Sequence, residues 1–464
     1  MTKKSEPEVF LWKNMKNQYF ATFAANLLIF SSGAVNGWVS PALSVLASDK
    51  SPLISGALTT DEISWIGSIN VLGAMMGTLS LGYFISLMGS KRAILLLTIP
   101  IIVFWLLVYF GNHYYYLLLG RVFAGIGGGG VLTALILYVS EISDDNIRGR
   151  LISSIHFIRN FGILVGFILG ASVDYMVIPR ISGIFPIVFI VSFVMLPNTP
   201  RYHLQKGQIQ KAEAALKYYN GFKGKSKQED DALYKEFERL KSIVNERKTE
   251  EKLQASDFFN RSALKGLGIG IILTTLSQLT GTPIITNYAV MIFEKAGTSM
   301  DPYVSSIMLG IALLLGSICT TYLADKLGRK FLNIMSLVGS ALGLFAVSLY
   351  HYLNINGYDL SSYQWVPVLS LSFVIFISAA GIIALSLVCS IEYLPSKIRT
   401  PGMAFIGFAF NITTFTSVKL LPFLLEVIDL HGCMTIFGVS CALGAIFIYF
   451  FVEETSGQCL DDVG

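Results

Sequence analysis

The sequence predicts an all-α membrane protein: twelve transmembrane helices in two six-helix bundles, with a cytosolic helical insert. Three observations lead to this fold class. The 464-residue chain is 53% hydrophobic and 14% charged, with a mean hydropathy of +0.62, whereas a soluble domain carries about 25% charged residues. The apolar residues fall into runs of the roughly 20 residues that a helix needs to cross a bilayer. A short polar pattern occurs once in each half of the chain.

That polar pattern joins two apolar runs in each half. The segment 321–330 repeats the segment 82–92, with Gly89 aligned to Gly328. A second pattern also recurs, a glutamate seven residues before an arginine, at Glu141 and Arg148 and at Glu392 and Arg399. Such duplication is typical of membrane transporters whose halves meet around a substrate path.

The apolar runs give the order of the elements. In chain order the twelve expected spans are residues 19–43, 62–86, 92–111, 114–139, 150–174, 180–197, 262–293, 302–325, 330–352, 366–393, 401–425 and 430–452. The expected domains are a cytosolic N-terminus (1–18), an N-terminal bundle (19–197), a cytosolic helical linker (198–261), a C-terminal bundle (262–453) and a cytosolic tail (454–464).

Basic residues are unequally divided between the two sides. The short loops on one side contain Lys91, Arg92, Arg148, Arg150, Lys326, Arg329, Lys330, Lys397 and Arg399. The connections on the other side contain only Lys50, Arg180 and Lys295. Because basic loops stay on the cytosolic side, both termini and the central loop are expected in the cytosol. Since the first 15 residues are polar and mixed in charge, no cleaved signal peptide is expected.

The long polar stretch 201–260 is the expected insert. Its pieces 210–220 and 228–248 are rich in Lys, Glu, Ala and Leu at helical spacing. A solvated linker is one interpretation. We favour surface helices that latch the two halves, because one helix face gathers an apolar stripe, formed by Ala212, Ala215, Leu216 and Tyr219.

Further motifs are spread over the chain: residues 64–68, Gly120-Arg121, residues 197–201, residues 278–281 and residues 292–297, together with the two repeated patterns. With these motifs the chain resembles the sugar porter branch of the major facilitator superfamily. Residues 37–42, Gly-Trp-Val-Ser-Pro-Ala, are most similar to the insect facilitated trehalose transporter-like group. The resemblance implies a plasma-membrane transporter for a small sugar, in which a monomer is sufficient, with no cofactor and no nucleic-acid partner.

The resemblance also implies a cytosolic gate of ion pairs that close in the outward-facing state. The residues at the matching positions are Arg92, Glu141, Arg148, Arg201, Asp325, Arg329, Glu392 and Arg399. The alternative is that these residues only mark helix ends and orientation. Ser86, Ser90 and Asn198 replace charged residues of the family pattern, which suggests a looser gate in the first half.

A sugar site requires amides and hydroxyls for the substrate hydroxyls and an aromatic face for its C–H surface. The candidates are Asn36, Trp38, Asn70, Gln278, Thr282, Asn287, Tyr288 and Asn411. Gly281 and Pro283 interrupt the seventh span and predict a broken helix beside a cavity. By resemblance Gln278 matches one of two adjacent sugar-binding glutamines, while Ser277 stands at the other position. Bonding between helices is the alternative role for each amide.

Charged residues inside the predicted spans indicate a functional site more specifically than amides and hydroxyls do. Arg121 and Arg159 fall well inside spans, without an acid at similar depth. Ser31 stands near the position where proton-coupled family members have an aspartate, so facilitated transport is expected rather than symport. Arg159 and His156, which replaces a family glutamine, would also suit an anionic solute. The alternative is that Arg159 bonds helix carbonyls or extends its charged end toward the membrane surface.

The predicted function is facilitative transport of a hexose or trehalose by alternating access. The alternatives are the same fold moving an organic anion or other small solute, or a receptor-like protein that binds sugar without transport. Enzymatic activity and a metal site are not expected. No nucleophile–base pair or metal-ligand cluster appears at suitable spacing, and the cysteines lie mostly in apolar runs.

Overall fold

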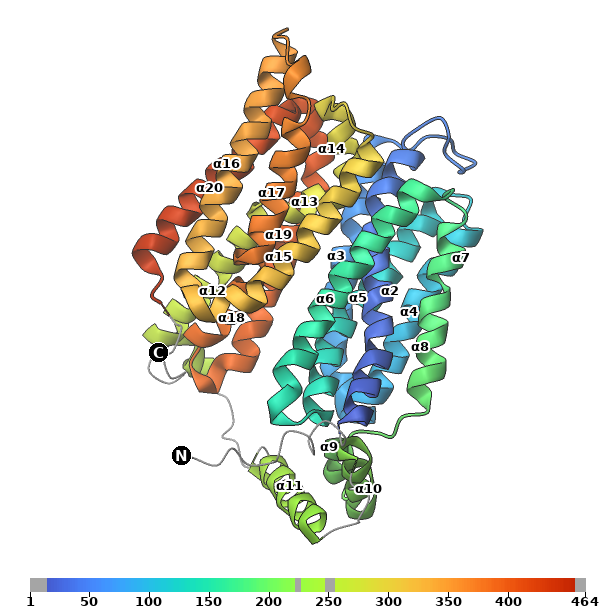
Figure 1. Ribbon diagram of the computed structural model, residues 1–464, viewed down its shortest axis with the longest axis vertical. Coiled ribbons are helices and arrows are strands. Elements are labelled where there is room, and N and C mark those ends of the chain that lie inside the picture. Colours follow the sequence, from blue (N-terminus) through green and yellow to red (C-terminus); the bar gives the residue numbers. More distant parts are fainter. Residues whose placement is uncertain (1–14, 222–226, 247–254, 455–464) are drawn as a thin grey trace, which may run out of the picture.

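The computed structural model describes residues 15–221, 227–246 and 255–454. Within this part of the chain, eleven helices are long and apolar enough to cross a membrane, and a shorter apolar segment, Ile178–Val194, stands at the sixth predicted span. All regular elements described are helices. Figure 1 shows them gathered into two bundles, with the insert helices at one end. The predicted fold class is confirmed.

The N-terminal bundle follows the predicted spans closely. Its helices are α2 (Lys16–Leu46), α3 (Thr60–Met88), α4 (Ser90–Phe110), α5 (Tyr114–Ile142), α6 (Asp145–Ser172), α7 (Ile178–Ser182) and α8 (Ile184–Val194). A capping box, formed by Thr59 and Glu62, starts α3, and the Asp144 carboxylate accepts from a free backbone N–H at the start of α6.

The C-terminal bundle has two interrupted spans. Its helices are α12 (Arg261–Leu279), α13 (Thr282–Asn287), α14 (Ala289–Ala296), α15 (Pro302–Leu327), α16 (Arg329–Ile355), α17 (Val366–Ala380), α18 (Ile382–Tyr393), α19 (Arg399–Val427) and α20 (Asp429–Phe451). The predicted break in the seventh span is confirmed at Gly281, which has a left-handed φ of 81°. The tenth span, predicted as one helix, is also broken, at Gly381, where Ser336 Oγ accepts the freed N–H of Ile382 at 3.2 Å.

The sequence repeat is also a structural repeat. Gly89 separates α3 from α4 with φ 84° and ψ 163°, and Gly328 separates α15 from α16 with φ 83° and ψ 153°. Residues with a side chain rarely adopt a positive φ of this size, so both copies of the motif require glycine at the turn.

Close packing in the N-terminal bundle relies on small residues. A Cβ atom on Gly37 of α2 would lie 2.1 Å from the carbonyl oxygen of Ile163 on α6, and one on Gly33 would lie 2.1 Å from that of Arg159. The backbones of α2 and α6 therefore approach each other to a distance that only glycine permits.

The insert consists of α9 (Pro200–Gln205), α10 (Ile209–Asn220), α11 (Lys227–Glu246) and the 3₁₀ turn η1 (Ala255–Phe259). The predicted apolar stripe of α10 is confirmed: its four residues are at most 5% exposed. The Tyr219 hydroxyl donates to the Pro197 carbonyl oxygen (2.7 Å) and lies 3.1 Å from the Tyr138 hydroxyl. The stripe thus packs on the N-terminal bundle, and a latch across both halves stays a prediction.

Candidate substrate site at the bundle interface

The two bundles touch at the end opposite the insert, which we call the far end (the top of Figure 1). Polar contacts there join Ser40 to Val290 N (3.0 Å), Ser44 to Glu294 (2.7 Å), Thr60 to Glu426 (2.5 Å), and Lys419 to Asp61 (2.9 Å) and Ser64 (2.6 Å). The bundles diverge toward the insert end (Figure 1). This conformer is therefore closed at the far end.

Tyr288 lies at the centre of the far-end closure. Its ring is 1% exposed, and its hydroxyl donates to the Val418 carbonyl oxygen of α19 at 3.0 Å. A Cβ atom on Gly67 of α3 would lie 2.2 Å from the same hydroxyl. The hydroxyl end of Tyr288, from the C-terminal bundle, therefore packs against Gly67 of the N-terminal bundle. Tyr288 was predicted to bind substrate, but in this conformer its hydroxyl serves the closure.

Gln278 lies in the last turn of α12, just before the break. It is 4% exposed; its Oε1 accepts from Thr414 Oγ1 of α19 at 2.9 Å, and its Nε2 donates to Ser277 Oγ at 3.0 Å. Thr282 is likewise buried, with its hydroxyl 3.0 Å from that of Thr280. The break between α12 and α13 is thus surrounded by polar side chains.

Three predicted asparagines share one arrangement. The side-chain N–H of each donates to a carbonyl oxygen one turn earlier in its own helix: Asn36 to Ser32, Asn287 to Pro283 and Asn411 to Gly407. All three are half-buried. Because each amide nitrogen donates to its own helix, the amide oxygen remains as an acceptor for another partner. Bonding between helices, the alternative considered for these residues, is not their arrangement in this structure.

Asn70 of α3 is also half-buried in the middle of its helix. By helical rise it lies about 15 Å from the first residue of α3, and Asn36 lies about 15 Å from the last residue of α2. Both helices have those residues at the far end, where Thr60 and Ser44 make contacts to the other bundle. The two amides therefore lie at similar depth.

His156 and Arg159 occupy one side of α6. His156 is exposed and Arg159 is half-buried, although both lie within a spanning helix. Phe157 and Phe161, 37% and 40% exposed, lie about 160° around the helix from Arg159, at 100° per residue. Arg159 therefore lies on the side of α6 opposite to these two phenylalanines.

Arg121 is different. It is 1% exposed, its Nε donates to the carbonyl oxygen of Ile66 at 2.9 Å, and its Nη2 donates to that of Gly67 at 3.3 Å. The sequence analysis considered bonding to helix carbonyls for Arg159, and it is Arg121 that adopts this arrangement here. It supports the turn of α3 against which Tyr288 packs.

The structure does not bring Trp38 to these residues. Its side chain is fully buried inside the N-terminal bundle, in an aromatic cluster formed by Phe104, Trp105 and Tyr175. Alternation of the α2 faces explains the difference: Asn36 and Trp38 are two residues apart, which is about 200° around a helix. A sugar-facing Asn36 and a sugar-facing Trp38 are mutually exclusive.

Six of the predicted gate residues contact residues of the same half of the chain in this conformer. A Glu141 carboxylate oxygen accepts from the Ser90 hydroxyl at 2.7 Å and lies 3.9 Å from Arg201. Two ion pairs follow: Arg329 pairs with Glu392, and Arg148 pairs with Asp145 at 2.7 Å. The Arg92 guanidinium lies 5.9 Å from the centre of the Tyr202 ring. The side chain of Asp325 lies outside the described residues.

Arg399 stands apart from this group. Its Nε and Nη2 are buried and have no hydrogen-bond partner in the described part of the chain. A buried guanidinium requires a polar partner, and the described residues do not supply one to these two atoms in this conformer.

Sequence reasoning missed Thr414 and Lys419. Lys419 Nζ lies 4.0 Å from the centre of the Trp65 ring as well as beside Asp61 and Ser64. A lysine inside the predicted eleventh span was the signal that could have indicated it. Thr414 had no such signal, because threonine is common in apolar helices.

Two halves of similar build, polar groups at their seam and closure at one end define a two-bundle membrane transporter. A family model described as "Sugar (and other) transporter" matches residues 18–464, and the chain belongs to this family. Its members are transporters rather than enzymes.

Among relatives, the facilitated trehalose transporter Tret1 of Polypedilum vanderplanki is 31% identical over 96% of this chain and 87% of its own length. Tret1 of Bombyx mori is 29% identical over 99% and 88%. An inward-open structure of the xylose transporter XylE from E. coli superposes with a TM-score of 0.76 at 18% identity, over 96% of this chain and 98% of that one, which supports the fold.

Proposed function

We propose that the protein moves a sugar, a hexose or trehalose, down its gradient by alternating access. The observation that carries this proposal is the contact of Gln278 with Thr414, a buried amide and hydroxyl that join two helices where the seventh span breaks. Gln278 has a second amide N–H and a second oxygen lone pair beyond these bonds, so together with the amide oxygens of the asparagines it offers both donors and acceptors to substrate hydroxyls. Family membership and the Tret1 relatives support the same substrate class.

In the cycle we propose, residues 19–197 and residues 262–453 rock against each other around the polar seam. The far-end contacts of Tyr288 and Lys419 open as the gate residues at the insert end close. The Lys419–Asp61 pair is partly exposed, and pairs of this kind contribute little to stability, so this contact can open during the cycle.

Uniport is proposed over proton symport. Acidic residues of the described spans, such as Asp61, Glu141, Glu294 and Glu392, lie near helix ends. Ser31, at the position expected for a proton-binding aspartate, is fully buried and has no charge. No titrating group at mid-depth in α2 is therefore available to couple a proton.

We propose that the insert end faces the cytosol and that the protein resides in the plasma membrane, with a monomer as the working unit. The basic residues of the short loops gather at the end that bears α9–α11. The XylE structure to which the chain is similar is described as inward open. An opening on the cytosolic side agrees with both observations.

A second candidate function is transport of an organic anion. It is favoured by the position of Arg159, half-buried at mid-depth in α6 on the side opposite Phe157 and Phe161, with His156 one turn before it. No hydrogen bond or ion pair joins either side chain to another described residue. An anionic substrate would supply the missing partner.

Uptake into proteoliposomes distinguishes these candidates. Purified protein is tested with labelled glucose, trehalose and a small carboxylate, alongside an Arg159→Ala variant and an Arg150→Ala control at the exposed insert end. The sugar proposal expects saturable uptake and counterflow of a sugar, with carboxylate uptake at background. Carboxylate uptake that Arg159→Ala abolishes would establish the anion candidate, and sugar binding without counterflow would indicate a receptor.

A further inference from the structure

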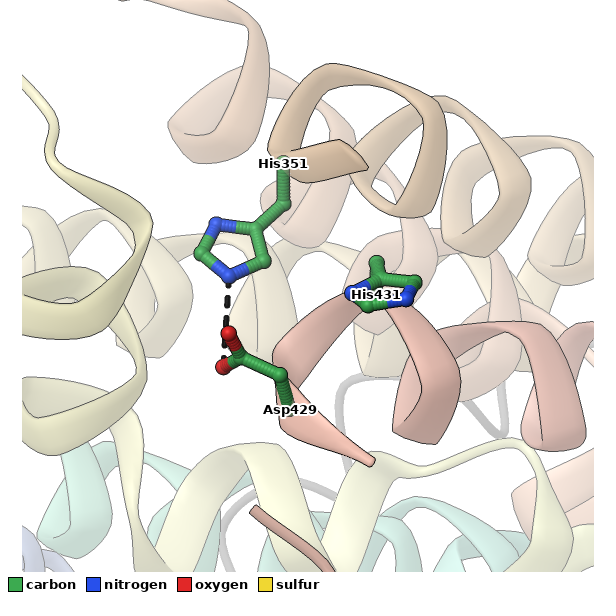
Figure 2. Close-up of side chains that lie close together, drawn as sticks. All are labelled: His351, Asp429 and His431. Atoms are coloured by element: carbon green, nitrogen blue, oxygen red, sulfur yellow. Dashed lines mark ion pairs between the residues drawn. The ribbon is translucent and has the colours of Figure 1, made fainter. Parts of the chain in front are cut away.

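Two histidines and an aspartate meet at the far end of the C-terminal bundle (Figure 2). His351 comes from the last turns of α16, whereas Asp429 and His431 come from the start of α20. One nitrogen or oxygen atom of each lies within 4.8 Å of those of the other two. These residues are far apart in the sequence, so their spacing along the chain gave no indication of a cluster.

We infer that this cluster is a binding site for a divalent transition-metal ion, with Zn²⁺ as its most suitable occupant. Two imidazoles and one carboxylate are the ligand set that zinc takes when a water fills the fourth position. The site lies outside the proposed sugar path and does not depend on the proposed function.

The geometry of the first pair suits zinc. His351 Nε2 lies 3.3 Å from Asp429 Oδ1. Ligand atoms at about 2.0–2.1 Å from a tetrahedral ion are about 3.3–3.4 Å apart. Figure 2 shows the imidazole and the carboxylate facing each other, with the His431 ring beside them. A nitrogen of His431 lies within 4.8 Å of the other two ligand atoms, so binding of the ion includes a movement of this side chain toward them.

Unsatisfied nitrogens provide an independent indication. His351 is 95% buried, at 5% exposure, and its Nε2, the nitrogen that faces Asp429, makes no hydrogen bond in the described part of the chain. His431 Nδ1 is also buried without a partner. A buried polar atom without a partner is costly, and coordination of a cation by the cluster offers a reason for retaining two such rings.

The backbone holds the ligands in place. Asp429 has a φ of 56°, a left-handed conformation adopted by no other non-glycine residue among those described. Its Oδ1 accepts from the N–H of Leu430 at 2.7 Å. The His431 carbonyl oxygen accepts from Ser348 Oγ of α16 at 2.8 Å, which ties the first turn of α20 to the helix that bears His351.

One cation already competes for the carboxylate. Lys295 Nζ of α14 lies 3.5 Å from Asp429 Oδ1 and donates to the Leu425 carbonyl oxygen at 2.7 Å. Metal binding would therefore draw Asp429 away from Lys295, at the end of the helix that closes the far end through Ser44 and Glu294. Occupancy of the metal site would thus change the Lys295–Asp429 contact of α14, the helix that also contacts the other bundle.

The test is titration of the full chain, purified without a polyhistidine tag, with ZnCl₂ by calorimetry. We expect one saturable ion per chain, with affinity reduced at least tenfold in each of His351→Gln, Asp429→Asn and His431→Gln. Asn tolerates the left-handed backbone of Asp429, and His113→Gln is the matched control at the exposed far end of the other bundle. Lys295→Met is expected to raise the affinity at least threefold, because a competing positive charge is removed.

Co²⁺ added to the unmodified chain provides a measurement that does not depend on folding of the variants. Visible absorption of the strength typical of four-coordinate Co²⁺, displaced by one equivalent of Zn²⁺, is the expected result. Absence of saturable Zn²⁺ binding in the unmodified chain, or binding that survives His351→Gln and His431→Gln, would overturn the proposal. Sugar uptake by the metal-free protein is unaffected by either outcome.

Discussion

The ammonium of Lys419 lies 2.9 Å from the carboxylate of Asp61, across the seam between the two bundles. The same lysine donates to Ser64 at 2.6 Å and lies over the Trp65 ring. One side chain of α19 thus reaches three neighbours on α3. Because Asp61 is 62% exposed at its side chain, this is a weak contact, suited to a closure that must open.

The first prediction concerns this contact. Lys419→Met should weaken far-end closure by about 1 kcal/mol, since partly exposed ion pairs contribute about 0.2–1 kcal/mol and the cation–π contact adds a similar amount. The expected result is labelling of a cysteine at Ile69 by an impermeant maleimide that is three to ten times faster from the far face. The background has the native cysteines replaced, and Lys419→Arg is the control. An unchanged labelling rate would show that apolar packing alone closes this end.

The second prediction concerns Gln278 and Thr414. Gln278→Ala should raise the half-saturating sugar concentration at least tenfold, because the loss of hydrogen bonds of about 1 kcal/mol each to the substrate amounts to one factor of ten or more. Thr414→Val should act in the same direction but less strongly. Zero-trans uptake measures both effects. Thr98→Val is the control, because Thr98 is a buried threonine of α4 that bonds only its own helix. If all three variants have the same half-saturating sugar concentration, Gln278 does not bind the substrate.

A third prediction concerns Arg399, whose Nε and Nη2 have no hydrogen-bond partner among the described residues. Arg399→Gln should leave thermal stability nearly unchanged, because the side chain has little to lose in this conformer. Net sugar uptake should fall at least fivefold, since the conformer closed at the insert end loses a partner for its acidic residues. Uptake and melting temperature are measured together, with Arg150→Gln as the control at the same end. A large loss of thermal stability with normal uptake per folded molecule would show that Arg399 stabilises the fold and does not act in the gate.

The fourth prediction concerns the packing of α2 on α6. Gly37→Ala should lower the free energy of unfolding by about 1–3 kcal/mol, because its Cβ would overlap the backbone of Ile163. The melting temperature of the detergent-solubilised protein should fall by several degrees. Gly268→Ala in α12 is the control, since a Cβ there meets nothing within 4 Å. Equal melting temperatures for the two variants would mean that α2 shifts away from α6 at little cost.

Much of the fold was predictable because its signals are local. Apolar runs, the glycine turns at Gly89 and Gly328 and the break at Gly281 each depend on a few neighbouring residues. The stripe of α10 was predictable for the same reason. The break at Gly381 was missed, because its freed N–H is satisfied by Ser336, a residue on another helix.

The candidate site was predictable only in part. Gln278 was found through the resemblance and the helix break, and Arg159 through its charge at membrane depth. Trp38 and Tyr288 were predicted to bind substrate, yet one is enclosed within a bundle and the other closes the far end. Residue type alone does not show which face of a helix an aromatic ring occupies.

By itself, the sequence determined that the chain crosses a membrane as two duplicated helical bundles with a helical insert. Hydropathy and turn preferences act along the chain, and burying apolar runs in lipid requires no knowledge of their neighbours. Only the tertiary structure decided which polar side chains meet: Gln278 with Thr414, Lys419 with Asp61, and His351 with Asp429. Such pairs depend on how helices distant in sequence are rotated and crossed, which is fixed by the packing of whole bundles.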